Sequence, residues 1–211
     1  VQEGALSLDS VKKHGTSTGV KYSGAISVAE DAQLHLDSAI PGNQNVIDLA
    51  GNITGSGLVS FGSTGSNYRI SGNNSGFSGV LSLGANEGIT YFADSASAGG
   101  ENTQLVLNGA NFTVEGEGAK TIVSKLNVTD DKTSTLTRGD NTYFTGAVTG
   151  NGTLKVNEGI RAALRGNLSL FDGAVNMVSG DSTMELGGAD VANAGGDIIA
   201  TLGGNGTYNT I

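Results

Sequence analysis

The feature that most constrains the fold is a short motif that occurs twice. Residues 70–83 read ISGNNSGFSGVLSL, and residues 137–150 read TRGDNTYFTGAVTG. Each copy has a glycine and polar turn-forming residues, then Phe, Ser or Thr, and Gly, and then a short apolar stretch. Gly and Asn adopt positive φ more readily than other residues, which suits them to tight turns. The chain is therefore expected to build the same turn and strand more than once.

A second repeat links other parts of the chain. Residues 51–61 (GNITGSGLVSF) resemble residues 146–156 (GAVTGNGTLKV). The matched pairs are Gly51/Gly146, Ile53/Val148, Thr54/Thr149, Gly55/Gly150, Ser56/Asn151, Gly57/Gly152 and Phe61/Val156. Weak self-similarity at variable spacing favours a three-faced parallel β-helix, in which each coil of roughly 20 residues stacks on the next one. The chain would then form about ten coils.

The apolar residues support an all-β fold. The chain has 35 glycines in 211 residues, but 37% of its residues are hydrophobic, and they fall in short alternating runs that predict strands rather than disorder. The sets expected to face inward are Ile26, Val28, Leu34, Leu36; Val59, Phe61; Phe77, Leu81, Leu83; Leu105, Leu107; Phe112, Val114; Ile122, Leu126, Val128; Phe144, Val148; Leu154, Val156; Leu168, Leu170; Val175, Met177; Met184, Leu186. Their spacing also permits an antiparallel β-sandwich, which is the alternative fold.

We interpret residues 1–211 as one β-helix segment, cut from a longer protein because the chain begins without Met and ends within its own pattern. Residues 1–22 are expected to form an irregular or short helical cap, since LDSVKKHG at residues 8–15 could form a turn or two of helix. No apolar run approaches 18 residues, so no membrane span is expected.

The repeats carry a family resemblance. The segments TGSGLVSF, YRISGNNSGFSGVLSLGANEGI and RGDNTYFTGAVTGNGTLKVNEG look like the passenger-associated repeat of bacterial autotransporters. The Gly, Asn, aromatic residue and Gly of that motif match Gly72, Asn74, Phe77 and Gly79, and again Gly139, Asn141, Phe144 and Gly146. The clear match covers about residues 51–90 and 136–160. The second copy departs from the motif because Arg138 stands where Ser is usual.

This resemblance implies a right-handed β-helix that is displayed on, or released from, the surface of a Gram-negative bacterium. The expected function is that of a non-enzymatic adhesin or self-association module, whose partners are a host-cell or bacterial surface protein or glycan. Two alternatives stay open: a polysaccharide-acting β-helix enzyme, and an inert stalk that carries another functional domain. The net charge of −9 argues against nucleic acid as a partner.

The candidate catalytic residues do not form a recognisable motif. The two histidines are His14 and His35, and alternation places His35 on the outer side of a strand as a solvated side chain. Glycan cleavage needs paired carboxylates, for which the candidates are Asp130, Asp131, Asp140 and Glu158, with Glu30 and Asp31 further away. We interpret these carboxylates as solvated turn residues and predict that the chain is not an enzyme.

No metal or cofactor is expected either. Double glycines recur at Gly187, Gly195 and Gly203, but a calcium-binding roll needs Asp where the chain has Ala192, Ala200 and Tyr208. We therefore interpret these glycines as corners between strands.

Two further groups of residues could contact a partner. The basic residues that come closest to clusters are Lys12, Lys13, Lys21, Arg161 and Arg165, and the pair Arg161 and Arg165 could form a small patch for an anionic glycan or simply balance charge. The aromatic residues near corners are Tyr68, Tyr91, Phe92 and Tyr143.

Overall fold

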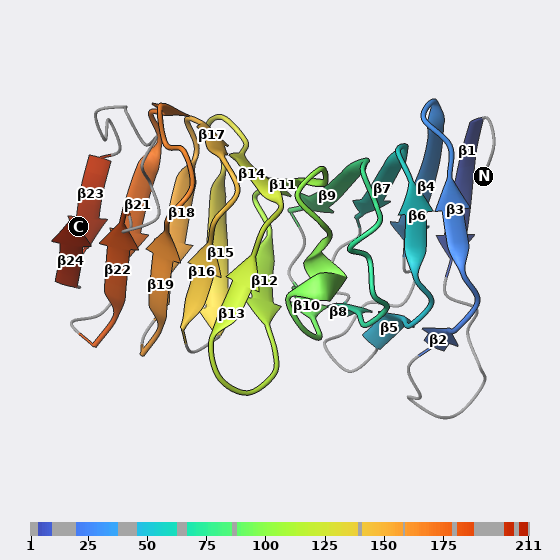
Figure 1. Cartoon of the computed structure of the whole chain (residues 1–211), viewed down its shortest axis with the longest axis horizontal. Helices are drawn as coiled ribbons and strands as arrows, with labels where there is room; N and C mark the ends of the chain where they lie inside the picture. Colours follow the sequence, from blue (N-terminus) through green and yellow to red (C-terminus); the bar gives the residue numbers. More distant parts are fainter. Residues whose placement is uncertain are drawn as a thin grey trace.

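The computed structural model describes residues 4–9, 20–37, 46–62, 67–85, 88–138, 141–157, 159–178, 181–187, 201–204 and 207–210. Its strands lie across the long axis of a rod and follow one another along that axis from β1 to β24 (Figure 1). All strand pairs in the described residues are parallel. The fold is therefore a parallel β-helix, as the repeats predict, and not the antiparallel sandwich.

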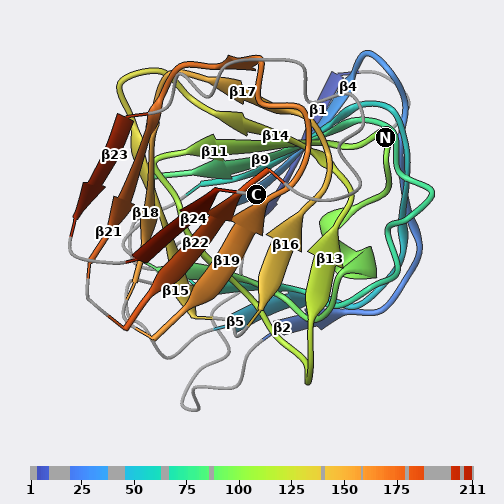
Figure 2. The ribbon, with the colours of Figure 1, turned by 60° about the vertical axis from the view of Figure 1, so that its left-hand side comes forward.

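Three faces enclose the core, and Figure 2 shows them around the axis. Sheet A contains β1 (Gly4–Asp9), β4 (Ala32–Asp37), β7 (Leu58–Phe61), β9 (Val80–Gly84), β11 (Gln104–Asn108), β14 (Lys125–Val128), β17 (Val148–Gly150) and β20 (Leu170–Phe171). Sheet B contains β2 (Val20–Tyr22), β5 (Val46–Leu49), β8 (Asn67–Ile70), β10 (Ile89–Phe92), β12 (Asn111–Val114), β15 (Thr133–Arg138), β18 (Thr153–Val156), β21 (Ala174–Met177) and β23 (Thr201–Gly204). These eight and nine strands come close to the predicted number of coils.

The third face is less regular. It begins with β3 (Ile26–Val28) and β6 (Ile53–Gly55) and resumes with β13 (Lys120–Ile122), β16 (Thr142–Phe144), β19 (Arg161–Leu164), β22 (Thr183–Leu186) and β24 (Thr207–Thr210). Between these two parts the chain passes through an isolated bridge at Phe77 and a short 3-10 helix, η1 (Ala96–Ala98).

Where the third face lacks regular strands, a buried asparagine supplies hydrogen bonds between the coils. Asn74 is fully buried, and its Oδ1 accepts a hydrogen bond of 2.7 Å from the backbone N of Ile53 in the preceding coil. Its Nδ2 donates a hydrogen bond of 2.8 Å to the backbone O of Ser97 in the following coil. One side chain therefore links three coils and satisfies buried backbone groups that have no strand partner there.

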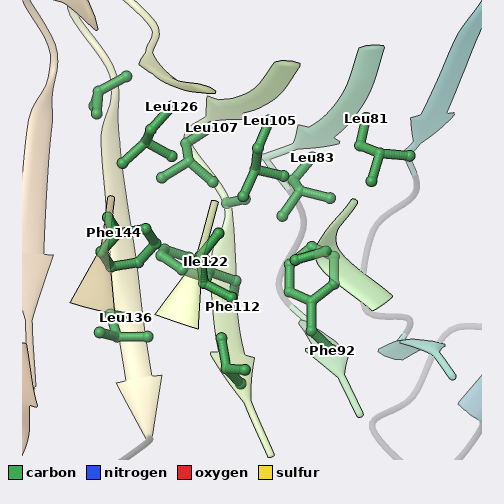
Figure 3. Close-up of a cluster of buried hydrophobic side chains, with 14 of the residues drawn as sticks. Leu81, Leu83, Phe92, Leu105, Leu107, Phe112, Ile122, Leu126, Leu136 and Phe144 are labelled. Carbon is green, nitrogen blue, oxygen red and sulfur yellow. The ribbon is translucent and has the colours of Figure 1, made fainter. Parts of the chain in front are cut away.

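The core consists of stacked apolar side chains from all three faces. Equivalent positions in successive coils lie in register, so that Leu34 pairs with Val59 and Val59 with Leu81. Figure 3 shows one part of this core, where Phe112 and Phe144 meet edge to face with their ring centroids 6.3 Å apart. Alternation of inward and outward side chains along short strands produces these stacks.

The two copies of the first motif occupy the same place in the coil. Each lies between a strand of sheet B and the next strand of sheet A, and each places its phenylalanine, Phe77 or Phe144, in the core of the third face. A Cβ added at Gly79 or Gly146 would lie 2.1 Å from a backbone oxygen of the preceding coil. Glycine is therefore required where these two corners stack most closely.

The second repeat, in contrast, recurs on different faces. Residues 51–61 run from the third face into sheet A, whereas residues 146–156 run from sheet A into sheet B. The corner is nevertheless the same, because Gly55 and Gly150 have φ of 96° and 97°. The local sequence therefore determines the geometry of the corner but not which two faces the corner connects.

The likeness extends to the neighbouring coils. Residues 23–33 stack before 51–61 and resemble residues 123–133, while residues 72–79 stack after them and resemble residues 166–173. We call each set a three-coil block. The backbone N of Ser75 donates to Oδ1 of Asn73 at 3.1 Å in the first block, and that of Ser169 donates to Oδ1 of Asn167 at 2.9 Å in the second. The chain thus repeats a block three coils deep, displaced by one face.

Some predictions about individual residues are wrong. Leu170 is 73% exposed, because the turn at Asn167–Ser169 shifts the alternation and turns Phe171 inward instead. Gly4–Asp9 and Val20–Tyr22 form strands rather than an irregular or helical cap; residues 1–3 and 10–19 lie outside the described residues. The other predicted inward residues are buried, except that Ile26 is only partly so.

Candidate functional site

A row of polar side chains runs along the outer side of sheet B. Parallel pairing brings one residue from each of six successive strands into register: Lys21, Asp48, Arg69, Tyr91, Thr113 and Arg138. Neighbouring positions in such a row are about 4.8 Å apart. We call these six residues the outer row of sheet B.

A β-bulge determines the direction of the last residue in the row. Leu136 points into the core, so regular alternation would turn Thr137 outward and Arg138 inward. The register between β12 and β15 shifts after Phe112, however, so that Arg138 lies opposite Thr113 and is exposed. Oγ1 of Thr113 donates a hydrogen bond of 2.6 Å to the backbone O of Arg138 and holds the bulge in place. Bulges commonly re-aim a side chain in this way.

The outer row opens into a cleft of about 370 Å³ at the corner between sheet B and the third face. Tyr91, Thr113, Glu115, Lys120 and Arg138 are among the residues that line it. The loop that forms one edge of the cleft, between β12 and β13, projects from the lower side of the rod in Figure 1. The cleft has the size of a small-molecule site, for which about 300–1,000 Å³ is usual.

One arginine, Arg69, joins two carboxylates beside this cleft. Nε of Arg69 donates to Oε2 of Glu115 at 2.9 Å, two coils further on, and Nη1 of Arg69 lies 3.9 Å from Oδ2 of Asp48, one coil back. Glu115 and Asp48 are therefore already paired. No carboxylate among the residues that the structure describes forms such an ion pair with Arg138.

The two arginines that the sequence singled out lie elsewhere, on the third face. Glu185 is 5% exposed, and its carboxylate accepts hydrogen bonds from Arg161 and from Nη2 of Arg165, the latter at 2.8 Å. The guanidinium of Arg165 also lies over the ring of Tyr143, 3.9 Å from its centroid. Both arginines are therefore engaged within the protein, and charge balance explains them.

This arrangement also sets the protonation of the carboxylate. The hydrogen bond from Arg161, followed by that from Arg165, lowers the pKa of Glu185 below its ordinary value, although burial acts in the opposite direction. Glu185 is thus held as an anion whose partners are both cations.

The candidate carboxylates for glycan cleavage are only partly described. Asp130 and Asp131 lie at an exposed corner between sheets A and B, where Oδ1 of Asp130 accepts a hydrogen bond of 3.1 Å from the backbone N of Asn151. Asp131 has φ of 56°, as a turn residue does. Glu30 and Asp31 are exposed at the equivalent corner of the other three-coil block. Asp140 and Glu158 lie outside the described residues.

His35 points outward as predicted, but it is partly buried, and its Nδ1 lies 2.8 Å from Oγ of Ser60 in the next coil. His14 lies outside the described residues, as do Lys12 and Lys13. Lys21 begins the outer row of sheet B and is exposed. Neither His35 nor Lys21 lies next to Asp130 and Asp131 at the corner between sheets A and B.

The aromatic candidates separate into two kinds. Tyr68 and Phe92 are fully buried, so the prediction that they could contact a partner is wrong. Tyr68 packs against Phe61, and its hydroxyl donates to the backbone O of Leu36 at 3.2 Å. Tyr91 and Tyr143 are partly exposed and remain available as contact points.

Of the two double-glycine positions that the structure describes, Gly187 and Gly203, one lies at a corner. Gly187 directly follows β22 and has φ of 87°, whereas Gly203 lies inside β23, so the corner prediction is wrong there. Gly195, Ala192 and Ala200 lie outside the described residues, and Tyr208 is part of β24. In the part of the chain that the structure covers, no three His, Cys, Asp or Glu side chains come together to hold a metal ion.

No protein-family model matches the chain, and no match was found among curated proteins or solved structures. Within the described ranges, no helix has the length and apolar character needed to cross a membrane. The function must therefore be argued from this chain's own residues.

Sequence reasoning missed Arg138 as a candidate, although a signal was present. In the first motif copy the corresponding residue is Ser71, whose hydroxyl donates to Oδ1 of Asp48. A cation in place of a serine is the departure from the repeat that distinguishes the second copy. What the sequence could not show is the bulge that turns this cation outward.

Proposed function

We propose that this chain is a non-enzymatic binding module: a β-helical segment of an autotransporter passenger that acts in adhesion or self-association on, or after release from, the surface of a Gram-negative bacterium. One observation carries the proposal. The described parts of the two copies of the passenger-type motif, residues 72–79 and 141–146, lie at the same place in a parallel β-helix, between sheet B and sheet A. This agrees with the fold that the resemblance implies.

The outer surface supports a binding role. In the outer row of sheet B, polar side chains repeat once per coil, with all but the buried Thr113 at least partly exposed, and sheet A carries a second such row with His35, Ser60 and Ser82. A long surface of this kind allows many weak contacts with a partner, which add up by multiplicity.

The experiment uses the purified chain in two assays. Beads coated with the chain are tested for adhesion to epithelial cells and to Gram-negative bacteria, with beads coated with serum albumin as control, and the free chain is examined by sedimentation velocity over a range of concentrations. We expect adhesion above the albumin control or reversible association of the chain. A chain that stays monomeric and coats beads that adhere to neither cell type would contradict the proposal, as would hydrolysis of any glycan in a broad panel.

A further inference from the structure

We propose that the cleft at the end of the outer row of sheet B binds the acidic group of an anionic sugar, with Arg138 as the cation that recognises a carboxylate or sulfate. This inference deepens the proposed function and rests on it, because it names a glycan as the partner and a site for it. The juxtaposition that carries it is Arg138 next to Thr113, with Tyr91 one coil beyond Thr113 in the same cleft, brought together from β15, β12 and β10.

The charge of the cleft differs from that of the whole protein. The chain has a net charge of −9, whereas Arg138 forms no ion pair with any carboxylate in the described part of the chain, and the nearby carboxylates Asp48 and Glu115 both pair with Arg69. Since Arg69 is committed to both of these carboxylates, they do not neutralise Arg138. An anion is thus attracted to this corner although the protein as a whole repels it.

The side chain of Arg138 suits a planar acidic group. The guanidinium donates two parallel hydrogen bonds to a carboxylate or sulfate, which a lysine cannot do. It stands on a bulge that Thr113 fixes by its 2.6 Å hydrogen bond, so the base of the side chain is held before a ligand arrives. Less ordering is then required on binding.

The remaining lining favours a sugar over a bare anion. Tyr91 is partly exposed and offers both an aromatic surface for the apolar side of a sugar ring and a hydroxyl for its polar edge. A volume of about 370 Å³ accommodates a single sugar unit, whereas an inorganic ion would leave most of it to water. A nucleic acid carries a charge on every phosphate, so the net charge of the chain repels it much more strongly than a sugar with one acidic group.

The third face serves as an internal comparison. Arg161 and Arg165 also lie on the surface of the rod, but Glu185 accepts hydrogen bonds from both of them. An anion there would have to displace a carboxylate that is only 5% exposed. We therefore assign the site to Arg138 and not to these arginines.

The test measures binding of galacturonic acid, glucuronic acid and glucose 6-sulfate to the whole chain by NMR chemical-shift changes of the backbone amides, with glucose as the neutral sugar and acetate as the bare anion. We expect the acidic sugars to shift the amides around Tyr91, Thr113 and Gly116, and glucose and acetate to bind at least ten-fold more weakly. The uronic acids and the sulfated sugar distinguish which acidic group is preferred.

Three variants locate the site. Arg138→Gln should weaken binding of the acidic sugars at least ten-fold, and Arg138→Lys should restore only part of it, because the charge returns without the planar fork. Lys155→Gln is the matched control: Lys155 lies on the same outer side of sheet B, one coil further on beside Thr135, and its loss should leave binding unchanged. An unchanged melting temperature of Arg138→Gln shows that the fold is intact.

The outcomes separate this inference from the proposed function. If the acidic sugars do not bind, if acetate binds as tightly as they do, or if Arg138→Gln binds normally, the sugar site is overturned. If the chain nevertheless adheres to cells or self-associates, the binding module itself still stands. If the chain neither adheres to cells nor self-associates, both proposals fall.

Discussion

Individual buried polar residues hold neighbouring coils together in this rod. Asn74 bridges three coils on the third face where strands are interrupted, and Glu185 joins Arg161 and Arg165 across adjacent strands. Both side chains are buried, and the backbone groups that pair with Asn74 would lose hydrogen bonds that water cannot replace. At the scale of the residue, these few polar contacts add to the stability that the apolar stacks provide.

Replacing Asn74 with Ala should destabilise the protein by about 2–5 kcal/mol, because it leaves the backbone N of Ile53 and the backbone O of Ser97 unpaired. Urea unfolding followed by circular dichroism measures the change. Asn73→Ala is the control, since Asn73 is exposed and its side chain accepts hydrogen bonds only from Ser75; its cost should stay under about 1 kcal/mol. Equal losses in the two variants would contradict the bridging role.

Replacing Glu185 with Gln should destabilise the protein at neutral pH by about 1–2 kcal/mol, since solvent screens its partly exposed arginine partners. The pKa of Glu185 is lowered in the folded state, so its contribution is fully present above the unfolded pKa of about 4.3. That contribution is lost as the pH falls through the lower folded pKa.

The difference in unfolding free energy between wild type and Glu185→Gln should therefore shrink at acid pH. Urea titrations at a series of pH values measure it, with Glu117→Gln in the exposed loop after β12 as a control that changes little at any pH. A difference that stays constant down to the lowest pH would show that the carboxylate charge is not what stabilises this contact.

At the scale of the element, corners rather than strands carry the distinctive sequence. Strands of two to six residues alternate inward and outward side chains in a simple way, whereas several corners require a glycine where one coil approaches the backbone of the preceding one. The corner at Gly79 lies against the backbone O of Gly57, and the equivalent corner at Gly173 lies against that of Gly152. The repeats detected in the sequence are therefore repeats of corners.

Gly79→Ala should lower stability by about 2–3 kcal/mol, because its Cβ would lie 2.1 Å from the backbone O of Gly57 and neither backbone can move without breaking the stack. Gly76→Ala, in the same motif, has no atom within 4 Å of the added Cβ. It should be neutral or stabilising by up to about 1 kcal/mol through the unfolded state. Thermal melts of the two variants compare them directly, and similar melting temperatures would refute a steric role for Gly79.

The sequence predicted the class of fold and most of the core, since alternation and repeats depend only on local order. It failed at Leu170 because an Asx-type turn at Asn167 adds an extra step to the alternation. It also failed at Arg138, whose outward direction depends on a bulge in the pairing of β15 with β12, two segments separated by a full coil. The local sequence pattern predicts whether a side chain points inward or outward, but the register between strands of adjacent coils determines its actual direction.

At the scale of the whole molecule, the two three-coil blocks are displaced by one face. Residues 51–61 cross from the third face to sheet A, and residues 146–156 cross from sheet A to sheet B, through corners of the same geometry. A block can therefore form the corner between any two faces whose strands lie in register. Because contacts are made only between adjacent coils, stability should be close to a sum over coils and their interfaces.

Deleting residues 104–124 tests this modularity. The deletion removes one coil and brings Lys125 to the place of Gln104, where it can pair with Val80 in the same register. We expect a folded β-rich protein with a lower melting temperature, measured by circular dichroism. Deleting residues 104–114 removes only part of a coil, misaligns every later strand and should abolish cooperative unfolding. If both deletions behave alike, the coils are not independent units.

The hydrogen bonds between strands in all three faces point along the axis of the rod, as the order of strands in Figure 1 makes clear. A pull along that axis would thus open one interface between coils at a time instead of loading all of them together. Each coil that opens, such as residues 104–124, replaces a rise of about 4.8 Å with up to about 70 Å of extended chain. Under tension the molecule would lengthen in steps, dissipating mechanical work while the unopened part keeps its surface intact.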